Sequence, residues 1–252
     1  MIHIRKLLIA LLMTAAAQGL FAQTIPGNVV ATTEWTAAFC RAAGLENVRV
    51  LAPAALRHPP DYELKPSDIP ALAEADLIVF AGYEGMMERI RANVAGRNIR
   101  MVQIETVYAP GIIEASVRKI AEAAGTQDFA EKELAAIAEA WADAARIIKE
   151  AGLAGKKTAA HRFQAPFAEA AGLDVVAIFG PPPPGPRLIG EIAGSGAELI
   201  LDNWHNPVSM PLREILNKAN AVELINFPGR HGTVSLKDVI RDNAETLAAS
   251  AR

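Results

Sequence analysis

The segment that most constrains this chain is residues 128–151, which contains neither glycine nor proline. It is rich in alanine, glutamate and lysine, which are strong helix formers, and Gly152 and Gly155 follow it. These features predict one uninterrupted helix. At about 1.5 Å per residue, its roughly 24 residues would span about 36 Å, enough to run along two separate lobes.

Short apolar runs alternate with helical stretches on both sides of this helix. Strands are predicted at 29–32, 48–51, 77–82 and 100–104 before it, and at 157–160, 175–179, 199–202 and 221–225 after it. Helices are predicted at 34–43, 67–74 with Ser67 as N-cap, 86–95, 163–171, 186–195, 210–218 and 236–249. This alternation favours parallel sheets with helices on both faces.

The predicted fold class is therefore α/β, with two lobes, each a parallel sheet flanked by helices, joined by one long α-helix. We assign residues 23–127 to an N-terminal lobe, 128–151 to the connector helix and 152–252 to a C-terminal lobe.

The first 22 residues have the pattern of an export signal. Arg5 and Lys6 precede a short apolar stretch, and Ala22 is the small residue expected at the cleavage site. The apolar stretch is too short to span a bilayer as a helix, and no cysteine follows it to carry a lipid anchor. We expect a periplasmic protein whose one cysteine, Cys40, is a buried apolar filler.

Charge and motifs exclude several function classes. The net charge is −3 and basic residues are scattered, which argues against a nucleic-acid partner. The sequence has no Gly-x-Ser-x-Gly elbow, no His-Glu-x-x-His pair and no phosphate-binding glycine loop. We therefore do not expect an enzyme.

The most informative histidine is His58, which lies in a proline-rich loop between two predicted strands, where binding residues are commonly presented. Tyr62, the run Pro66-Ser67-Asp68 and the stretch 75–79 follow it. This block resembles the first metal-ligand loop of the solute-binding proteins of zinc and manganese ABC importers. The resemblance extends more loosely over nearly the whole chain after the export signal, including the single connector helix.

The resemblance implies a metal site assembled from loops that follow strands, where ligands gather in parallel α/β sheets. It assigns the first ligand to His58 and another to His161, which precedes the pairs Phe167-Ala168 and Gly172-Leu173. Where the family usually has a second histidine, the one residue here that could bind a metal is Glu105.

The family's final aspartate is replaced by Asn226, and a neutral amide is a poor zinc ligand. His205 and His231 lie nearby in loops of the second half and could compensate for this loss. Asp202, at a strand end, is predicted to orient a histidine.

The implied function is capture of a divalent transition metal as the transported ligand, with Zn²⁺ preferred over Mn²⁺ because imidazole-rich coordination suits zinc. The implied partner is a membrane permease, and we expect a monomer. The missing ligands leave open an exported metal-dependent enzyme or a family member with an altered ligand.

Overall fold

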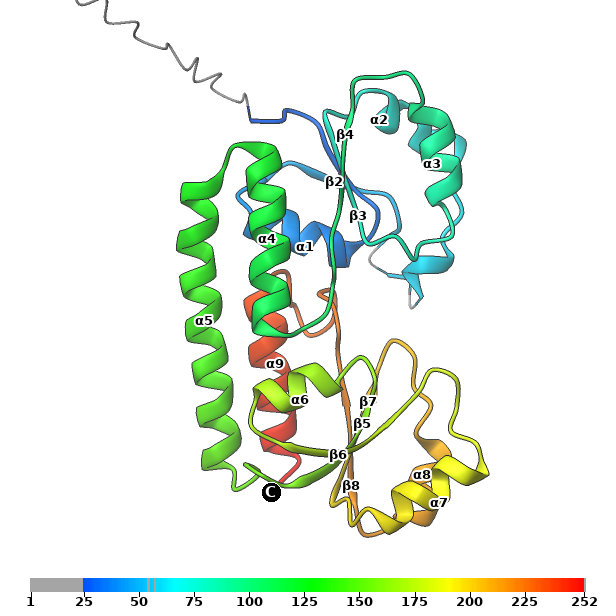
Figure 1. The fold of residues 1–252 in the computed structure, drawn as a ribbon, viewed down its shortest axis with the longest axis vertical. Coiled ribbons are helices and arrows are strands. Elements are labelled where there is room, and N and C mark those ends of the chain that lie inside the picture. Colours follow the sequence, from blue (N-terminus) through cyan, green and yellow to red (C-terminus); the bar gives the residue numbers. More distant parts are fainter. Residues whose placement is uncertain (1–24, 54, 57, 252) are drawn as a thin grey trace, which may run out of the picture.

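The computed structural model describes residues 25–53, 55–56 and 58–251. The predicted export signal at 1–22 lies outside the described residues. The described chain forms two lobes, each built on a four-stranded parallel sheet, as Figure 1 shows. This confirms the predicted α/β fold class. No helix in the described part of the chain is long and apolar enough to cross a membrane.

The first lobe has the strand order β2-β1-β3-β4. Its strands are β1 (Val29–Ala31), β2 (Val48–Val50), β3 (Leu77–Phe80) and β4 (Arg100–Gln103). Its helices are α1 (Glu34–Ala42), α2 (Ile69–Ala73), α3 (Met87–Val94) and α4 (Pro110–Ala124), with short 3-10 turns at Pro59–Asp61 and Pro66–Asp68.

Both faces of this sheet are covered because successive side chains of a strand point to opposite faces. Leu77 and Val79 of β3 pack with α1 and α4, whereas Ile78 and Phe80 pack with α2 and α3. Every residue of β3 is buried, as expected for a central strand of a parallel sheet.

The second lobe repeats the same topology, with the order β6-β5-β7-β8. Its strands are β5 (Lys157–His161), β6 (Asp174–Phe179), β7 (Leu199–Asn203) and β8 (Asn220–Leu224). Its helices are α6 (Ala165–Ala170), α7 (Pro186–Gly194), α8 (Met210–Ile215) and α9 (Leu236–Ala249).

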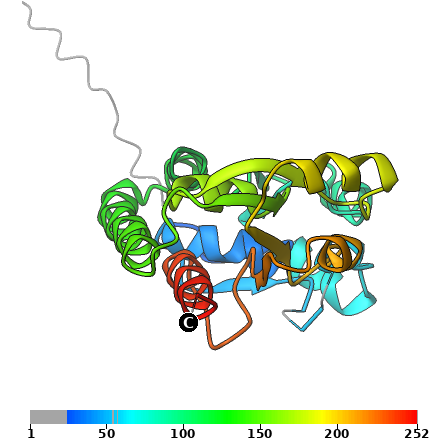
Figure 2. The same ribbon diagram turned by 90° about the horizontal axis from the view of Figure 1, so that it is seen from below.

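The predicted connector is one unbroken helix, α5, from Gln127–Glu150, and it starts and ends one residue earlier than predicted. It packs against α4 of the first half and α9 of the second. Figures 1 and 2 show α5 and α9 side by side, and α9 also reaches α1. The connector is thus the outer member of a group of packed helices.

Two local predictions need correction. No element was predicted for residues 110–124, yet they form the 15-residue helix α4. Pro110 begins this helix, and Gly125, in the left-handed conformation, ends it. Ser67 is not the N-cap of α2, because residues 66–68 form a 3-10 turn and Asp68 occupies the cap position. Cys40 is fully buried, as predicted.

Candidate functional site

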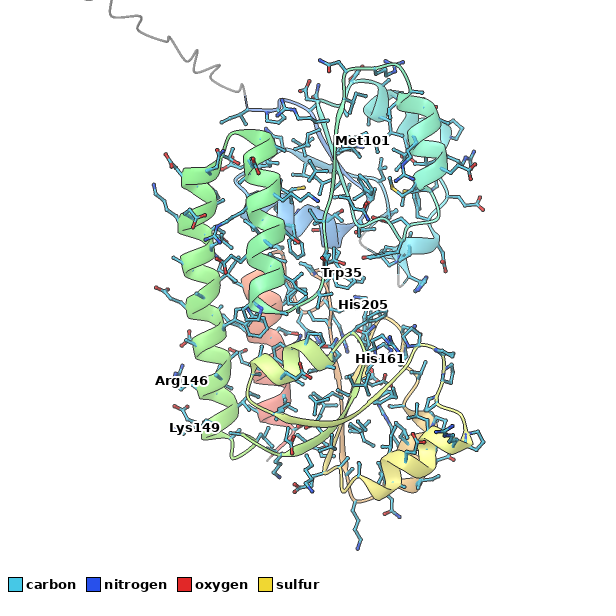
Figure 3. All side chains as sticks on the ribbon, in the orientation of Figure 1. Trp35, Met101, Arg146, Lys149, His161 and His205 are labelled. Carbon is cyan, nitrogen blue, oxygen red and sulfur yellow. The ribbon has the colours of Figure 1, made fainter. Side chains whose placement is uncertain are left out.

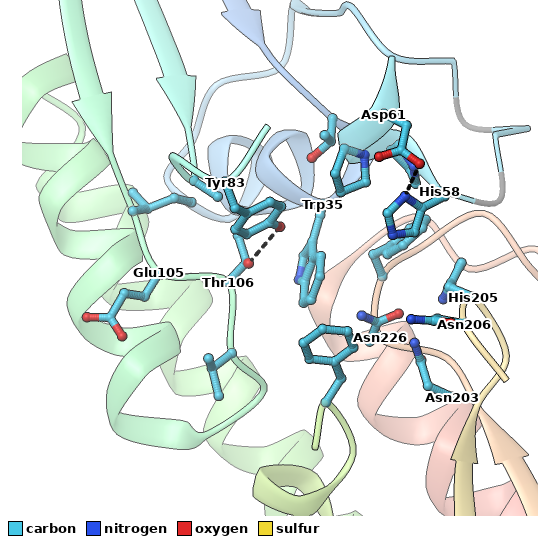
Figure 4. Close-up of a pocket in the computed structure, with 18 residues that line it drawn as sticks. Trp35, His58, Asp61, Tyr83, Glu105, Thr106, Asn203, His205, Asn206 and Asn226 are labelled. Atoms are coloured by element: carbon cyan, nitrogen blue, oxygen red, sulfur yellow. Dashed lines mark hydrogen bonds and ion pairs between the residues drawn. The ribbon is translucent and has the colours of Figure 1, made fainter. Parts of the chain in front are cut away.

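A cleft of about 570 Å³ lies where the carboxyl ends of the strands of both sheets meet. Its walls come from loops that follow β1, β2, β3 and β4 in the first lobe and β5, β7 and β8 in the second. Figure 4 shows these walls, which comprise Thr33, Trp35, His58, Pro59, Pro60, Asp61, Ala81, Tyr83, Ile104, Glu105, Thr106, Val107, Phe163, Asn203, His205, Asn206, Asn226 and Phe227.

His58 enters the cleft from the first lobe, at the start of the 3-10 turn Pro59–Asp61. Its Nδ1 lies 2.7 Å from the Asp61 carboxylate, and about half of its side chain is exposed. A carboxylate at Nδ1 favours the tautomer with hydrogen on Nδ1, which leaves the Nε2 lone pair for a ligand. In that tautomer His58 can bind a metal ion through Nε2.

His205 enters the cleft from the second lobe, in the loop after β7, and is 7% exposed. Its ring stacks on Phe227, with centroids 3.5 Å apart and an interplanar angle of 25°. Figure 3 shows Trp35 and His205 at the junction of the lobes. The cleft thus has one imidazole from each lobe.

Asp202 fixes the loop that carries His205. Its buried carboxylate accepts hydrogen bonds from the backbone N–H groups of Asn203 (2.8 Å), Val208 (3.1 and 3.2 Å) and Ser209 (2.8 Å). The prediction that Asp202 orients a histidine thus has a structural counterpart, although it acts here through the loop backbone.

A row of aromatic rings lines the cleft. The Trp35 ring lies 5.6 Å from Phe227 and 6.4 Å from Tyr83, measured between centroids. The Tyr83 hydroxyl lies 3.1 Å from the Thr106 hydroxyl, which ties the loops after β3 and β4 together. These rings give the cleft an apolar wall, and His205 stacks on one of them, Phe227.

The loop that carries Tyr83 is held from beneath by Glu84, which is 3% exposed. The Glu84 carboxylate accepts hydrogen bonds from the N–H of Ala81 (2.8 Å), the N–H of Gly82 (2.6 Å) and the hydroxyl of Thr32 (2.5 Å). Gly82 has φ of 101°, and a Cβ there would lie 2.3 Å from the Gln103 side chain. The turn therefore depends on this glycine.

Three predicted ligands are placed differently. His161, the last residue of β5, does not line the cleft; it is fully buried beneath it between Phe163 and Phe179. Its Nδ1 accepts the Phe163 N–H (3.1 Å), and its Nε2 has no hydrogen-bond partner. Burial lowers the pKa of His161 to about 4, while the Asp202 carboxylate raises it and Arg162 lowers it further.

His231 lies outside the cleft, about half exposed, with Nδ1 2.9 Å from the Asp242 carboxylate of α9. Glu105 borders the cleft, but Figure 4 shows its carboxylate directed away from His58 and His205. Within the described residues, no group of three His, Cys, Asp or Glu side chains is arranged to hold a metal ion.

The aromatic and amide residues of the lining were not predicted, because they are not residue types that commonly bind metals. They are in particular Trp35, Tyr83, Phe227, Asn203 and Asn206. Asn203 is the last residue of β7, and the other four lie in segments that follow the carboxyl ends of parallel strands, so the same positional rule applies to all five.

No protein-family model matches this sequence, and a comparison with curated protein sequences finds no match. Solved structures do match. A Mn-bound periplasmic metal-binding protein from Candidatus Liberibacter asiaticus superposes with a TM-score of 0.66 at 13% identity, covering 89% of this chain and 99% of that one.

Two further structures agree. A deletion mutant of ZnuA with zinc bound gives a TM-score of 0.62 at 18% identity, over 88% of this chain and 97% of that one. The solute-binding protein FpvC from P. aeruginosa in complex with Ni²⁺ gives 0.67 at 17% identity, over 88% and 96%. This chain has the fold of periplasmic metal-binding proteins. That confirms the architecture implied by the resemblance.

Proposed function

We propose that this protein is the periplasmic solute-binding component of an ABC importer. It captures a divalent transition metal in the cleft between its lobes and delivers it to a membrane permease. The observation that carries the proposal is the cleft itself, which His58 enters from one lobe and His205 from the other. A solute bound by both would contact both lobes at once.

Zinc is the preferred ion in this proposal. Two imidazoles suit Zn²⁺, whereas Mn²⁺ prefers oxygen ligands. The Asp61 carboxylate at His58 Nδ1 holds the orientation of that imidazole, which leaves Nε2 to bind the metal. The fold neighbours carry manganese, zinc and nickel in their structures, which supports a metal as the class of solute.

Titration calorimetry with zinc tests the proposal on the protein without its first 22 residues. Loss of a hydrogen-bond partner of a metal-bound histidine costs about 10- to 100-fold in affinity, so loss of the histidine itself should cost at least about 100-fold. We expect His58→Ala and His205→Ala each to show such a loss.

His231→Ala is the matched control, because this histidine is also paired with an aspartate but lies outside the cleft. We expect it to bind zinc like the natural protein. Equal zinc affinity in all three variants would refute the proposal, as would the absence of binding for zinc, manganese and nickel in the natural protein.

A further inference from the structure

The cleft offers a metal fewer protein donors than the ion needs. Zinc is almost always four-coordinate in proteins. In the described part of the chain, no three His, Cys, Asp or Glu side chains form a metal-binding group, and His58 and His205 are the two imidazoles that line the cleft. The remaining coordination positions therefore call for donors from outside the protein.

The cleft is also large for a bare ion. Its volume is about 570 Å³, whereas one water occupies about 30 Å³ in the liquid. A volume of several hundred Å³ is typical of sites for small organic molecules, which are mostly apolar with a few placed polar groups. Two of the aromatic residues that line it, Tyr83 and Phe163, are 50% and 38% exposed.

Two polar groups in the wall have no protein partner. The buried Nε1–H of Trp35 and the buried Oδ1 of Asn226 make no hydrogen bond, and Asn226 as a whole is 4% exposed. Leaving such groups unsatisfied is costly, so each indicates an absent partner. Both groups lie beside the aromatic row formed by Trp35, Tyr83 and Phe227, and both are closed to solvent.

Charge limits the ligand further. The Asp61 carboxylate lies beside His58 in the cleft, the Glu105 carboxylate borders the cleft but points away from the histidines, and among residues 25–53, 55–56 and 58–251 no lysine or arginine lines it. A ligand with several negative charges would be repelled by the Asp61 carboxylate and would have no cationic side chain to pair with in the described lining. A planar molecule of low charge fits these walls better.

We propose that the cleft takes its metal ion together with a small planar aromatic chelator of low charge. The imidazoles of His58 and His205 supply two donors, and the chelator supplies the others. Its ring lies along the aromatic row, and the Trp35 and Asn226 side chains turn toward the cleft so that its polar edge bonds Trp35 Nε1–H and the Asn226 amide. This inference rests on the proposed function, since it names the form in which the metal is bound.

Calorimetry with zinc and pyridine-2-carboxylate mixed 1:1 tests this inference. That ligand chelates through its ring nitrogen and one carboxylate oxygen, which leaves the second oxygen for a hydrogen bond. We expect the mixture to bind at least about tenfold more tightly than zinc alone. Pyridine-4-carboxylate is the control, because it has the same size and charge but cannot chelate, and it should give no gain.

Two variants locate the chelator. Trp35→Phe keeps an aromatic ring but removes the N–H donor, and Asn226→Ala removes the amide. One hydrogen bond corresponds to roughly a 3- to 10-fold change in affinity, so each variant should lower the affinity of the mixture by that factor. Both variants should still bind zinc alone, which shows that they are folded, and the loss of affinity for the mixture should exceed any loss for zinc alone.

Asn226→Asp provides an independent measurement. It replaces the amide by a carboxylate in the same wall, so zinc alone should bind more tightly and the advantage of the chelator should shrink. If pyridine-2-carboxylate lowers zinc binding or leaves it unchanged in the natural protein, the chelator inference is wrong and the proposed function stands. If zinc binds neither alone nor in the mixture, both are wrong.

Discussion

At the scale of single residues, the cleft depends on how each histidine is embedded. His58 is half exposed and paired with Asp61, His205 is stacked on Phe227, and His161 is sealed beneath the cleft. These three histidines thus lie in three different environments. Sequence alone identified all three positions but not these environments, because burial is set by neighbours distant in the chain, such as Gly180 against His161.

His161 makes the stability of the fold sensitive to acid. Its pKa is about 4 in the folded protein and about 6.5 when unfolded. As the pH falls from about 6.5 to about 4, the unfolded chain binds a proton that the folded chain does not, so stability falls by up to about 3 kcal/mol. Urea unfolding at pH 4, 5, 6 and 7 measures this loss.

The control for this pH dependence is His161→Leu, which has similar volume and no titrating group. It loses the acceptor for the Phe163 N–H and should be less stable by about 1 kcal/mol at neutral pH. The free energy of unfolding of this variant should fall less steeply than that of the natural protein as the pH is lowered. Parallel pH profiles for the two proteins would contradict the assignment of this effect to His161.

At the scale of elements, the loop after β7 is the part of the site most dependent on one side chain. Asp202→Asn replaces one of the two carboxylate oxygens with an amide NH₂ group. This group cannot accept the backbone N–H groups that the carboxylate oxygens accept. We expect a loss of about 1–3 kcal/mol in urea unfolding and weaker zinc binding through a displaced His205. Asp174→Asn, at an exposed carboxylate that begins β6, should change neither quantity.

The elements also show what periodicity can and cannot predict. All eight strands that the described residues form, and most of their helices, were predicted within a few residues, because apolar runs and breakers define them locally. Helix α4 was missed although Pro110 and Gly125 mark its ends. Its apolar residues Ile113, Val117 and Ile120 follow helical spacing, so the sequence does contain a periodic pattern that indicates this helix.

The lining of the site was harder to predict than the fold. Convergence of His58 with His205 and Asn226 requires both lobes to be placed relative to each other, and no local pattern encodes that arrangement. For the same reason His231 was predicted beside the others, whereas in the structure it pairs with Asp242 outside the cleft. Whether His161 or His231 ever binds a metal stays a prediction.

At the scale of the whole molecule, α5 limits how the lobes can move. It is continuous over 24 residues and buries Leu134, Ile137, Trp141 and Ile148 against its neighbours. Bending it would break hydrogen bonds and expose these side chains, so zinc should change the lobe angle only slightly. Small-angle scattering with and without zinc checks this, and a clear compaction on binding would count against a rigid connector.

The position of α9 has a consequence for how the chain unfolds. This last helix packs on α5 and reaches α1, and a single continuous hydrophobic cluster includes residues of both sheets and of α1, α4, α5, α6 and α9. Cutting the chain between its lobes would separate helices that pack on one another across the lobes, such as α9 and α1. We therefore expect the two sheets of the described chain to unfold together, in one cooperative transition.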